Sequence, residues 1–220
     1  MGCDGSSWYG IGKMDDNDMW YLQAKAKQTS GKKSNRNYFI TGYFAKKLVS
    51  YQNSMVPASI QIETYAFPII RLADLYLLYA ECLNEANRNA GAPPADCYTY
   101  IDKVRRRAGF PDGVRKDWAD HSNNPTKPDS YEGFRDIVRQ ERMIELALEG
   151  QRFWDLRRWN LAVEYLNKPM RSWDIEQEKT EDYYKLRTYY IRDFLKRDNL
   201  WPLKTNDLIV NPNLKQNPGW

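Results

Sequence analysis

The chain has 220 residues and a mass of 26.0 kDa, which allows one large domain or one and a half at about 150 residues per domain. Hydrophobic residues make up 42%, charged residues make up 28%, and the mean hydropathy is -0.79. These values exclude a chain that is mostly membrane-spanning or disordered. Lys and Arg number 33 against 29 Asp and Glu, and this balance of +4 is too small and too dispersed for a nucleic-acid-binding surface. We therefore expect a globular protein without a nucleic-acid partner.

Histidine and cysteine are scarce in this sequence. His121 is the single histidine and lies in a polar stretch, and Cys3, Cys82 and Cys97 contain no C-x-x-C pair. Histidine-dependent metal sites and Ser-His or Cys-His catalysis therefore have at most one candidate residue, and no disulfide framework is indicated. We expect no metal ion and no cofactor.

The first 36 residues are polar and irregular, with aromatic residues set singly among them. Aromatic side chains make up 14% of the chain, more than a core of this size needs. Rings in loops are suited to stacking on the apolar faces of sugars, while nearby amides and carboxylates bind the hydroxyl groups. The candidate carbohydrate-binding residues are Trp8, Tyr9, Trp20 and Tyr21. The alternative is that these rings pack under a loop or against a part of the protein that is missing from this chain.

Residues 38–49 alternate as in a strand that breaks at Gly42. Further along, a helix is predicted from about Arg71 to Asn89, because apolar residues recur there at helical spacing. Its inward stripe is expected to be Leu72, Leu75, Tyr76, Tyr79, Leu83 and Ala86.

A second helix is predicted to begin at Pro93 and Pro94 and to end at Gly109. The two helices would form a hairpin over residues 71–109, close to the tetratricopeptide repeat of about 34 residues. The inward residues of the second helix are expected to be Cys97, Ile101, Val104 and Ala108.

Residues 110–129 are predicted to form a loop, and Ser130 is the expected N-cap of a third helix. Gly150 interrupts the helical pattern, which continues from about Arg152 to Leu166, so helices occupy residues 130–168. Residues 170–199 show no clear period, and residues 200–220 are expected to form an ordered coil of Asn-Pro and Pro-Gly turns. The inward residues of the third helix are expected to be Phe134, Ile137, Val138, Met143 or Ile144, and Leu148.

The densest group of charges lies near the third helix. Glu141, Glu145, Glu149 and Arg152 would share one face if the helix continued through Gly150. Paired carboxylates can act as acid and base in glycoside hydrolysis. However, arginines lie within one turn of each carboxylate and would keep it ionised, which is the wrong state for a general acid. A structural ion-pair network is therefore favoured over catalysis.

Four blocks of the chain resemble the C-terminal region of SusD/RagB-family nutrient-uptake lipoproteins. A further segment upstream, Thr41-Gly42-Tyr43-Phe44 followed by Lys46-Lys47, is similar to the Gly-Tyr-Tyr segment of that family. The four blocks comprise residues 70–81, residues 104–109, residues 141–159, and a closing block of residues 201–203 with residues 211–220.

The resemblance implies a mainly α fold, with tetratricopeptide-like helical hairpins and a loop-rich, irregular C-terminal part. It implies a surface-exposed lipoprotein of the Bacteroidetes outer membrane that binds an oligosaccharide or another nutrient for polysaccharide utilisation. The protein would act as the lid of a SusC-like TonB-dependent transporter and would not be an enzyme. Only Met1 and Gly2 precede Cys3, without a signal peptide or lipobox. We therefore expect residues 1–220 to be a C-terminal SusD/RagB-like domain without the N-terminal repeats and the lipid anchor.

The family places its ligand-binding residues in variable loops, so none is carried over by position. The family blocks are expected to be architectural, which leaves Trp8, Trp20, Trp118 and Trp173 free to contact a sugar or a transporter. Two other functions stay open: an intracellular helical-repeat module for protein interactions, and a glycoside hydrolase using Glu141 and Glu145. A structural network of buried or half-buried charges is expected to comprise Arg71, Glu81, Arg142, Glu145, Arg152, Asp155 and Arg158.

Overall fold

Helices dominate the part of the chain that the computed structural model describes. The chain divides into two compact units, Tyr65–Asp155 and a second made of Met1–Thr64 with Leu156–Trp220. We call the first the helical unit and the second the mixed unit. Among the described residues, no helix is both long enough and apolar enough to cross a membrane. The structure describes residues 24–28, 31–33, 38–43, 45, 47–48, 50, 54–56, 59–64 and 66–220.

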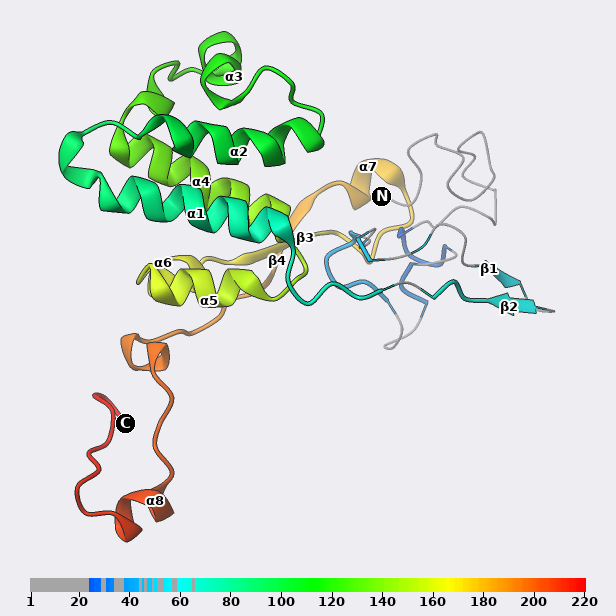
Figure 1. Cartoon of the computed structure of the whole chain (residues 1–220). Helices are drawn as coiled ribbons and strands as arrows, with labels where there is room; N and C mark the ends of the chain where they lie inside the picture. Colours follow the sequence, from blue (N-terminus) through cyan, green and yellow to red (C-terminus); the bar gives the residue numbers. More distant parts are fainter. Residues whose placement is uncertain are drawn as a thin grey trace. The chain divides into compact units, whose positions relative to one another are not determined.

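The helical unit is built on three helices, with α1 lying beside both α2 and α4 (Figure 1). The fourth helix, α3, packs on α2. The helical hairpin predicted from the sequence corresponds to α1 and α2. The helices are α1 (Leu72–Ala86), α2 (Ala95–Arg107), α3 (Val114–His121) and α4 (Tyr131–Glu145), with 3-10 turns η2 (Arg88–Ala90) and η3 (Lys127–Asp129).

The core of this unit lies among its four helices. The buried face of α1 differs from the predicted stripe, because Leu72, Leu75 and Tyr79 are exposed whereas Leu77 and Ala80 are buried. Apolar side chains surround most of α1, so periodicity does not identify the face that α2 and α4 cover. The core residues are Leu77, Ala80, Cys97, Ile101, Val104, Val114, Phe134, Ile137 and Val138.

The predicted stop and start signals have the expected geometry at most helix ends. Gly109, with φ +98°, follows α2, and the Ser130 side chain accepts a hydrogen bond from the backbone N–H of Gly133 at 3.1 Å. The prediction for the end of α4 was wrong. This helix stops at Glu145, and Leu148 is exposed because its own φ of +67° turns the chain out of the helix. Four other residues expected to point inward are also exposed: Ala86, Ala108, Met143 and Ile144.

The segment between α2 and α4 contains a helix where a loop was predicted. Gly113 has φ +86°, and the backbone N–H of Val114 donates to Asp102 Oδ1 at 2.7 Å. The group that satisfies the first turn of α3 therefore comes from α2 rather than from a neighbouring residue. Local capping patterns do not reveal such a partner, which explains why the helix was not predicted.

The mixed unit contains short helices and two antiparallel hairpins. In the second hairpin, Trp173 pairs with Leu186 and Met170 pairs with Tyr190, with a register shift after Met170. Helix α5 begins in the last residues of the helical unit. The elements are β1 (Ser54–Val56), β2 (Ser59–Gln61), α5 (Gln151–Arg158), α6 (Ala162–Leu166), β3 (Met170–Trp173), α7 (Thr180–Tyr183), β4 (Leu186–Tyr190), η4 (Lys196–Asn199) and α8 (Thr205–Val210).

Four sequence predictions change in or next to the mixed unit. The helix predicted from about Arg152 to Leu166 is divided into α5 and α6, with Asn160 at φ +56° between them. No strand occurs among the described residues of 38–49, where a turn with Gly42 at φ +73° takes its place. The hairpin of β3 and β4 was not predicted, because all five residues of β4 are exposed and no polar–apolar alternation marks it. The tail contains α8 within the predicted coil, and this helix stops before the Asn-Pro pair at residues 211–212.

Candidate functional site

Four aromatic residues are predicted to bind carbohydrate. Trp8, Tyr9, Trp20 and Tyr21 all lie outside the described residues, so their role stays a prediction. The candidate features that the structure describes are the charged residues of the helical unit and a group of aromatic residues in the mixed unit.

Arg142 is the most deeply buried charge of the predicted network, with its side chain 2% exposed. Its guanidinium donates to both carboxylate oxygens of Asp155, at 2.9 and 3.1 Å, and to Oδ1 of Asp74 at 2.8 Å. Glu81 Oε2 lies 4.0 Å away. A guanidinium can be buried in this way because carboxylates meet its planar set of donors. The arrangement ties α1, α4 and the residue Asp155 of α5 together.

Arg71 occupies the position before α1 and binds the turn that follows α4. Its Nη1 donates to Glu145 Oε1 at 2.7 Å, its Nη2 donates to the carbonyl oxygen of Glu145 at 2.8 Å, and its Nε donates to Glu149 Oε2 at 2.9 Å. The hydrogen bond to Glu149 is the main cause that raises the pKa of Arg71, against the opposing effect of burial. Arg107 adds a second guanidinium to Glu145, at 2.5 Å. Two arginines thus hold one carboxylate.

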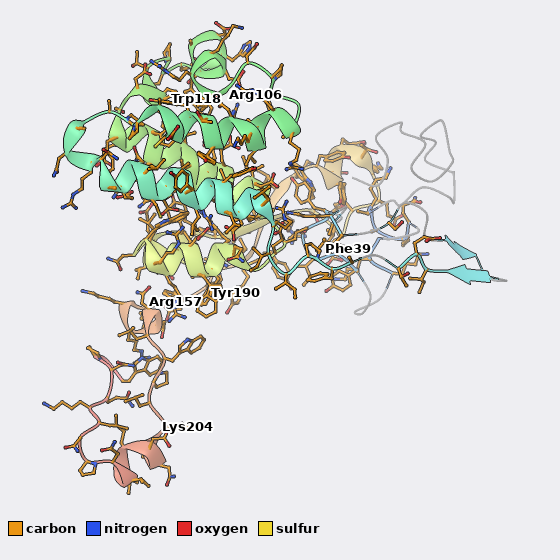
Figure 2. All side chains as sticks on the ribbon, viewed as in Figure 1. Phe39, Arg106, Trp118, Arg157, Tyr190 and Lys204 are labelled. Atoms are coloured by element: carbon orange, nitrogen blue, oxygen red, sulfur yellow. The ribbon has the colours of Figure 1, made fainter. Side chains whose placement is uncertain are left out.

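A fourth arginine, Arg105, was not among the predicted network residues and pairs with Glu141. Arg105 donates to Glu141 and, at 2.6 Å, to Asp117 Oδ2. Burial raises the pKa of Glu141, while Arg105 acts in the opposite direction. The Arg105 guanidinium also lies 5.3 Å from the ring centre of Trp118, which packs partly buried against the core on the α3 side of α2 (Figure 2). The signal for Arg105 was its place in the block of residues 104–109.

The other predicted members are less enclosed. Arg152 is half-buried, whereas Arg158 is exposed and lies over the ring of Trp159 at 4.7 Å, so the prediction of burial was wrong for Arg158. Glu141, Glu145, Glu149 and Arg152 do not share a helical face, because α4 ends at Glu145 and Gly150 has φ +80°. The role of these charges as a purely structural network stays a prediction.

Three aromatic rings gather in the mixed unit, and we call them the aromatic cluster: Tyr43, Trp173 and Tyr184. The ring centres of Tyr43 and Trp173 are 5.7 Å apart, and those of Trp173 and Tyr184 are 5.3 Å apart at an interplanar angle of 83°. Trp173 is half-buried, whereas Tyr43 is 51% exposed and Tyr184 is 53% exposed. Two open rings therefore flank one that is partly covered, an arrangement of interacting aromatic side chains.

Backbone hydrogen bonds and one buried side chain hold the aromatic cluster in place. The backbone N–H of Trp173 donates to the carbonyl oxygen of Thr41 at 3.2 Å, and the backbone N–H of Asp174 donates to the carbonyl oxygen of Tyr183 at 2.9 Å. The hydroxyl of Tyr183 donates to the carbonyl oxygen of Gly42 at 2.8 Å, and burial raises the pKa of Tyr183 to about 12. A side chain at position 42 would collide with this hydroxyl, and φ is +73° there, so the turn requires glycine.

Polar side chains adjoin the rings. Arg187 Nη1 donates to Asp174 Oδ1 at 2.8 Å, and Gln177 Nε2 donates to Asp174 Oδ2 at 3.2 Å. Burial acts to raise the pKa of Asp174, but the hydrogen bonds from Arg187 and Gln177 and from the N–H of Glu176 together lower it. Among the described residues, no group of three or more His, Cys, Asp or Glu side chains could hold a metal ion. The described residues here can therefore stack a ligand on an aromatic ring and form hydrogen bonds with it.

These features define a mainly helical protein with a tetratricopeptide-like hairpin, internally paired charges and exposed aromatic rings in a loop-rich part. The family model of the SusD family matches residues 1–220. The chain belongs to the SusD family.

Two curated relatives come from Formosa agariphila. SusD-like protein P25 is 32% identical over 144 residues, which are 66% of this chain and 22% of that protein. SusD-like protein P38 is 29% identical over 154 residues, which are 68% of this chain and 24% of that protein. The matched part of the chain thus spans less than a quarter of the length of either relative.

Two solved structures share the fold. The structure of selenomethionine BT4246 has a TM-score of 0.70 and 30% sequence identity, covering 90% of this chain and 33% of that chain. A SusD-like protein (BF3747) from Bacteroides fragilis NCTC 9343 has a TM-score of 0.60 and 26% identity, covering 84% of this chain and 31% of that chain. The tetratricopeptide-like helical fold predicted from the sequence is therefore confirmed.

Proposed function

We propose that this protein binds oligosaccharides at the cell surface for nutrient uptake. The observation that carries the proposal is the match of all 220 residues to the SusD family, a family of carbohydrate-binding proteins that the sequence blocks resemble. The exposed rings of the aromatic cluster support it, because they offer a stacking surface beside hydrogen-bonding groups. Oligosaccharides are the substrate class, and the protein captures them without cleaving them.

We propose that the intact protein works as the lid of a SusC-like TonB-dependent transporter and is held at the outer membrane by a lipid anchor. The names of the relatives support this role in general terms, since P25 and P38 are SusD-like proteins. In this role the protein hands its ligand to the transporter, so binding must be strong enough to capture the ligand and reversible enough to release it.

The charged block gives no support to the alternative of a glycoside hydrolase. Arg105 binds Glu141, while Arg71 and Arg107 both bind Glu145. A retaining or inverting glycosidase needs a carboxylic acid that is free to face the leaving-group oxygen, whereas guanidinium groups bind the carboxylates of both Glu141 and Glu145 here.

The proposed function is tested by measuring binding of the intact protein to an oligosaccharide array and then measuring the affinity of positive sugars by calorimetry. We expect reversible binding to one class of oligosaccharide and no new reducing ends after long incubation. Co-purification with an outer-membrane transporter tests the lid role. Release of new reducing ends would overturn the binding-only proposal, and failure to bind any oligosaccharide would overturn the proposed ligand class.

A further inference from the structure

We propose that the aromatic cluster of Tyr43, Trp173 and Tyr184 is a binding site for neutral oligosaccharides. This inference rests on the proposed function and deepens it by placing a contact surface within the described residues. The main evidence is the exposure of Tyr43 and Tyr184, because more than half of the surface of each residue is accessible to solvent. An open ring beside a fixed neighbour offers a flat apolar face that matches the C–H face of a pyranose.

The cluster is organised before any ligand binds. The backbone N–H of Trp173 donates a hydrogen bond to the carbonyl oxygen of Thr41, and the Tyr183 hydroxyl donates one to the carbonyl oxygen of Gly42. Tyr43 follows that turn directly, so its ring is positioned by a glycine-dependent conformation. Because the rings are already ordered, less conformational entropy is lost when a ligand binds.

The charges around the cluster favour a neutral ligand over an acidic one. Asp174 pairs with Arg187, and among the described residues of the mixed unit four further acidic residues pair with lysines. A site for a uronic acid or a sulfated sugar would instead direct guanidinium or ammonium groups at the ligand, and the Arg187 guanidinium is already engaged by Asp174. The polar atoms of Asp174, Gln177 and Arg187 remain suited to sugar hydroxyl groups, because carboxylate oxygens accept several hydrogen bonds and guanidinium groups donate several. The four further pairs are Lys27–Glu178, Lys32–Glu176, Lys168–Glu164 and Lys185–Asp182.

The test compares single substitutions in the intact protein. The probes are immobilised neutral gluco-, xylo- and manno-oligosaccharides, with alginate and carrageenan oligosaccharides as the acidic set. The variants Tyr43→Ala and Tyr184→Ala each remove one exposed ring, whereas Tyr184→Phe keeps the ring. The matched control is Tyr190→Ala, which removes a ring that is 57% exposed at the opposite end of β4 from the residue that pairs with Trp173. The label of Tyr190 marks that end in Figure 2.

We expect neutral oligosaccharides to bind the unsubstituted protein and each alanine variant of the cluster to bind about tenfold more weakly. Tyr184→Phe and Tyr190→Ala should retain the original affinity. Circular dichroism and melting curves should show that all four variants are folded, which is expected because the substituted side chains are exposed.

Five results would overturn the inference. If the unsubstituted protein binds neutral sugars but the cluster variants bind them equally well, the site is elsewhere and the proposed function survives. If Tyr190→Ala weakens binding as much as the cluster variants do, the effect is not local to the cluster. If only acidic sugars bind, the ligand class is wrong. If the cluster variants lose only transporter binding, the rings form a protein interface. If no oligosaccharide binds to the unsubstituted protein, the proposed function fails together with this inference.

Discussion

Single arginine side chains contribute to the stability of the helical unit through buried ion pairs. The guanidinium of Arg142 is buried and meets two carboxylates, those of Asp155 and Asp74. If the arginine is removed, the buried Asp155 and the partly buried Asp74 both lose the cation that they share. The loss of one partner from a buried pair costs more than the pair itself contributes relative to apolar residues.

We therefore expect Arg142→Ala to reduce the free energy of unfolding by about 3–5 kcal/mol. Denaturant unfolding followed by circular dichroism measures this loss. Arg158→Ala is the matched control, because Arg158 is exposed, and it should change stability by less than about 1 kcal/mol. Equal losses for the two variants would show that burial of the guanidinium is not what matters.

Glu85 is expected to make stability depend on pH. Hydrogen bonds from Arg135, at 2.7 and 2.9 Å, are the main cause that lowers the pKa of Glu85 below 4.5. Burial acts to raise this pKa, whereas a hydrogen bond of 2.6 Å from the Tyr131 hydroxyl lowers it further. A carboxylate whose pKa is lower in the folded state stabilises the protein above the unfolded pKa. That stability is lost as the pH falls through the folded pKa.

The variant Glu85→Gln should therefore be less stable than the unsubstituted protein at neutral pH, by on the order of 1 kcal/mol for this partly exposed pair. The difference should shrink as the pH falls below 4.5. Unfolding curves recorded between neutral and acidic pH measure it. Glu164→Gln, at an exposed position of α6, serves as the control, and a difference independent of pH would contradict the assignment to Glu85.

At the scale of elements, the ends of helices follow local chemistry more closely than their faces do. The start of α4 is marked by Ser130, whose side chain accepts from Gly133 N–H. Gly133 also has a steric role, because a side chain there would collide with the carbonyl group of Lys127. The chain from η3 into α4 thus depends on a cap and on a close backbone approach.

Replacement of the cap should weaken α4. We expect Ser130→Ala to lower the free energy of unfolding by about 1 kcal/mol, because the first-turn N–H of Gly133 loses its acceptor. Ser130→Asp keeps an acceptor at this position and should stay close to the original stability. Thermal and denaturant unfolding of the two variants measures the difference; equal destabilisation by both would mean that the cap hydrogen bond is not the cause.

At the scale of the molecule, the C-terminal residues are held to an earlier part of the mixed unit. The indole N–H of Trp220 lies 3.1 Å from the carbonyl oxygens of both Arg197 and Leu200, and the Arg197 guanidinium lies 4.8 Å from the Trp220 ring centre. The Gln216 side chain bonds both the N–H and the carbonyl oxygen of Leu203. The segment from η4 to the last residue is therefore closed on itself by side-chain to backbone bonds.

We expect Trp220→Ala to open this closure. Amide hydrogen exchange should become faster over residues 197–203 and 216–220, while the helical unit keeps its protection. The free energy of unfolding should fall by on the order of 1 kcal/mol, because indole bonds to two carbonyl oxygens are lost. Ile209→Ala removes an exposed side chain of α8 and is the control. Unchanged exchange near Arg197 in Trp220→Ala would contradict the closure.

Local sequence predicted those parts of this protein whose cause is local. Gly109 and Ser130 mark helix ends because the required conformation or acceptor belongs to the residue itself. Apolar spacing predicted the hairpin of α1 and α2, and the ordered blocks indicated the SusD family that the comparisons show.

Tertiary packing decided the rest, because the deciding partner lies far away in the chain. The face of α1 that is buried depends on where α2 and α4 lie, and α3 takes its first acceptor from Asp102 on α2. Trp173 was expected to be a free ring, but its surroundings are set by Tyr43 and by Tyr184 across the β3–β4 connection. Periodicity reports which residues are apolar, whereas burial and ring contacts depend on which element arrives to cover them.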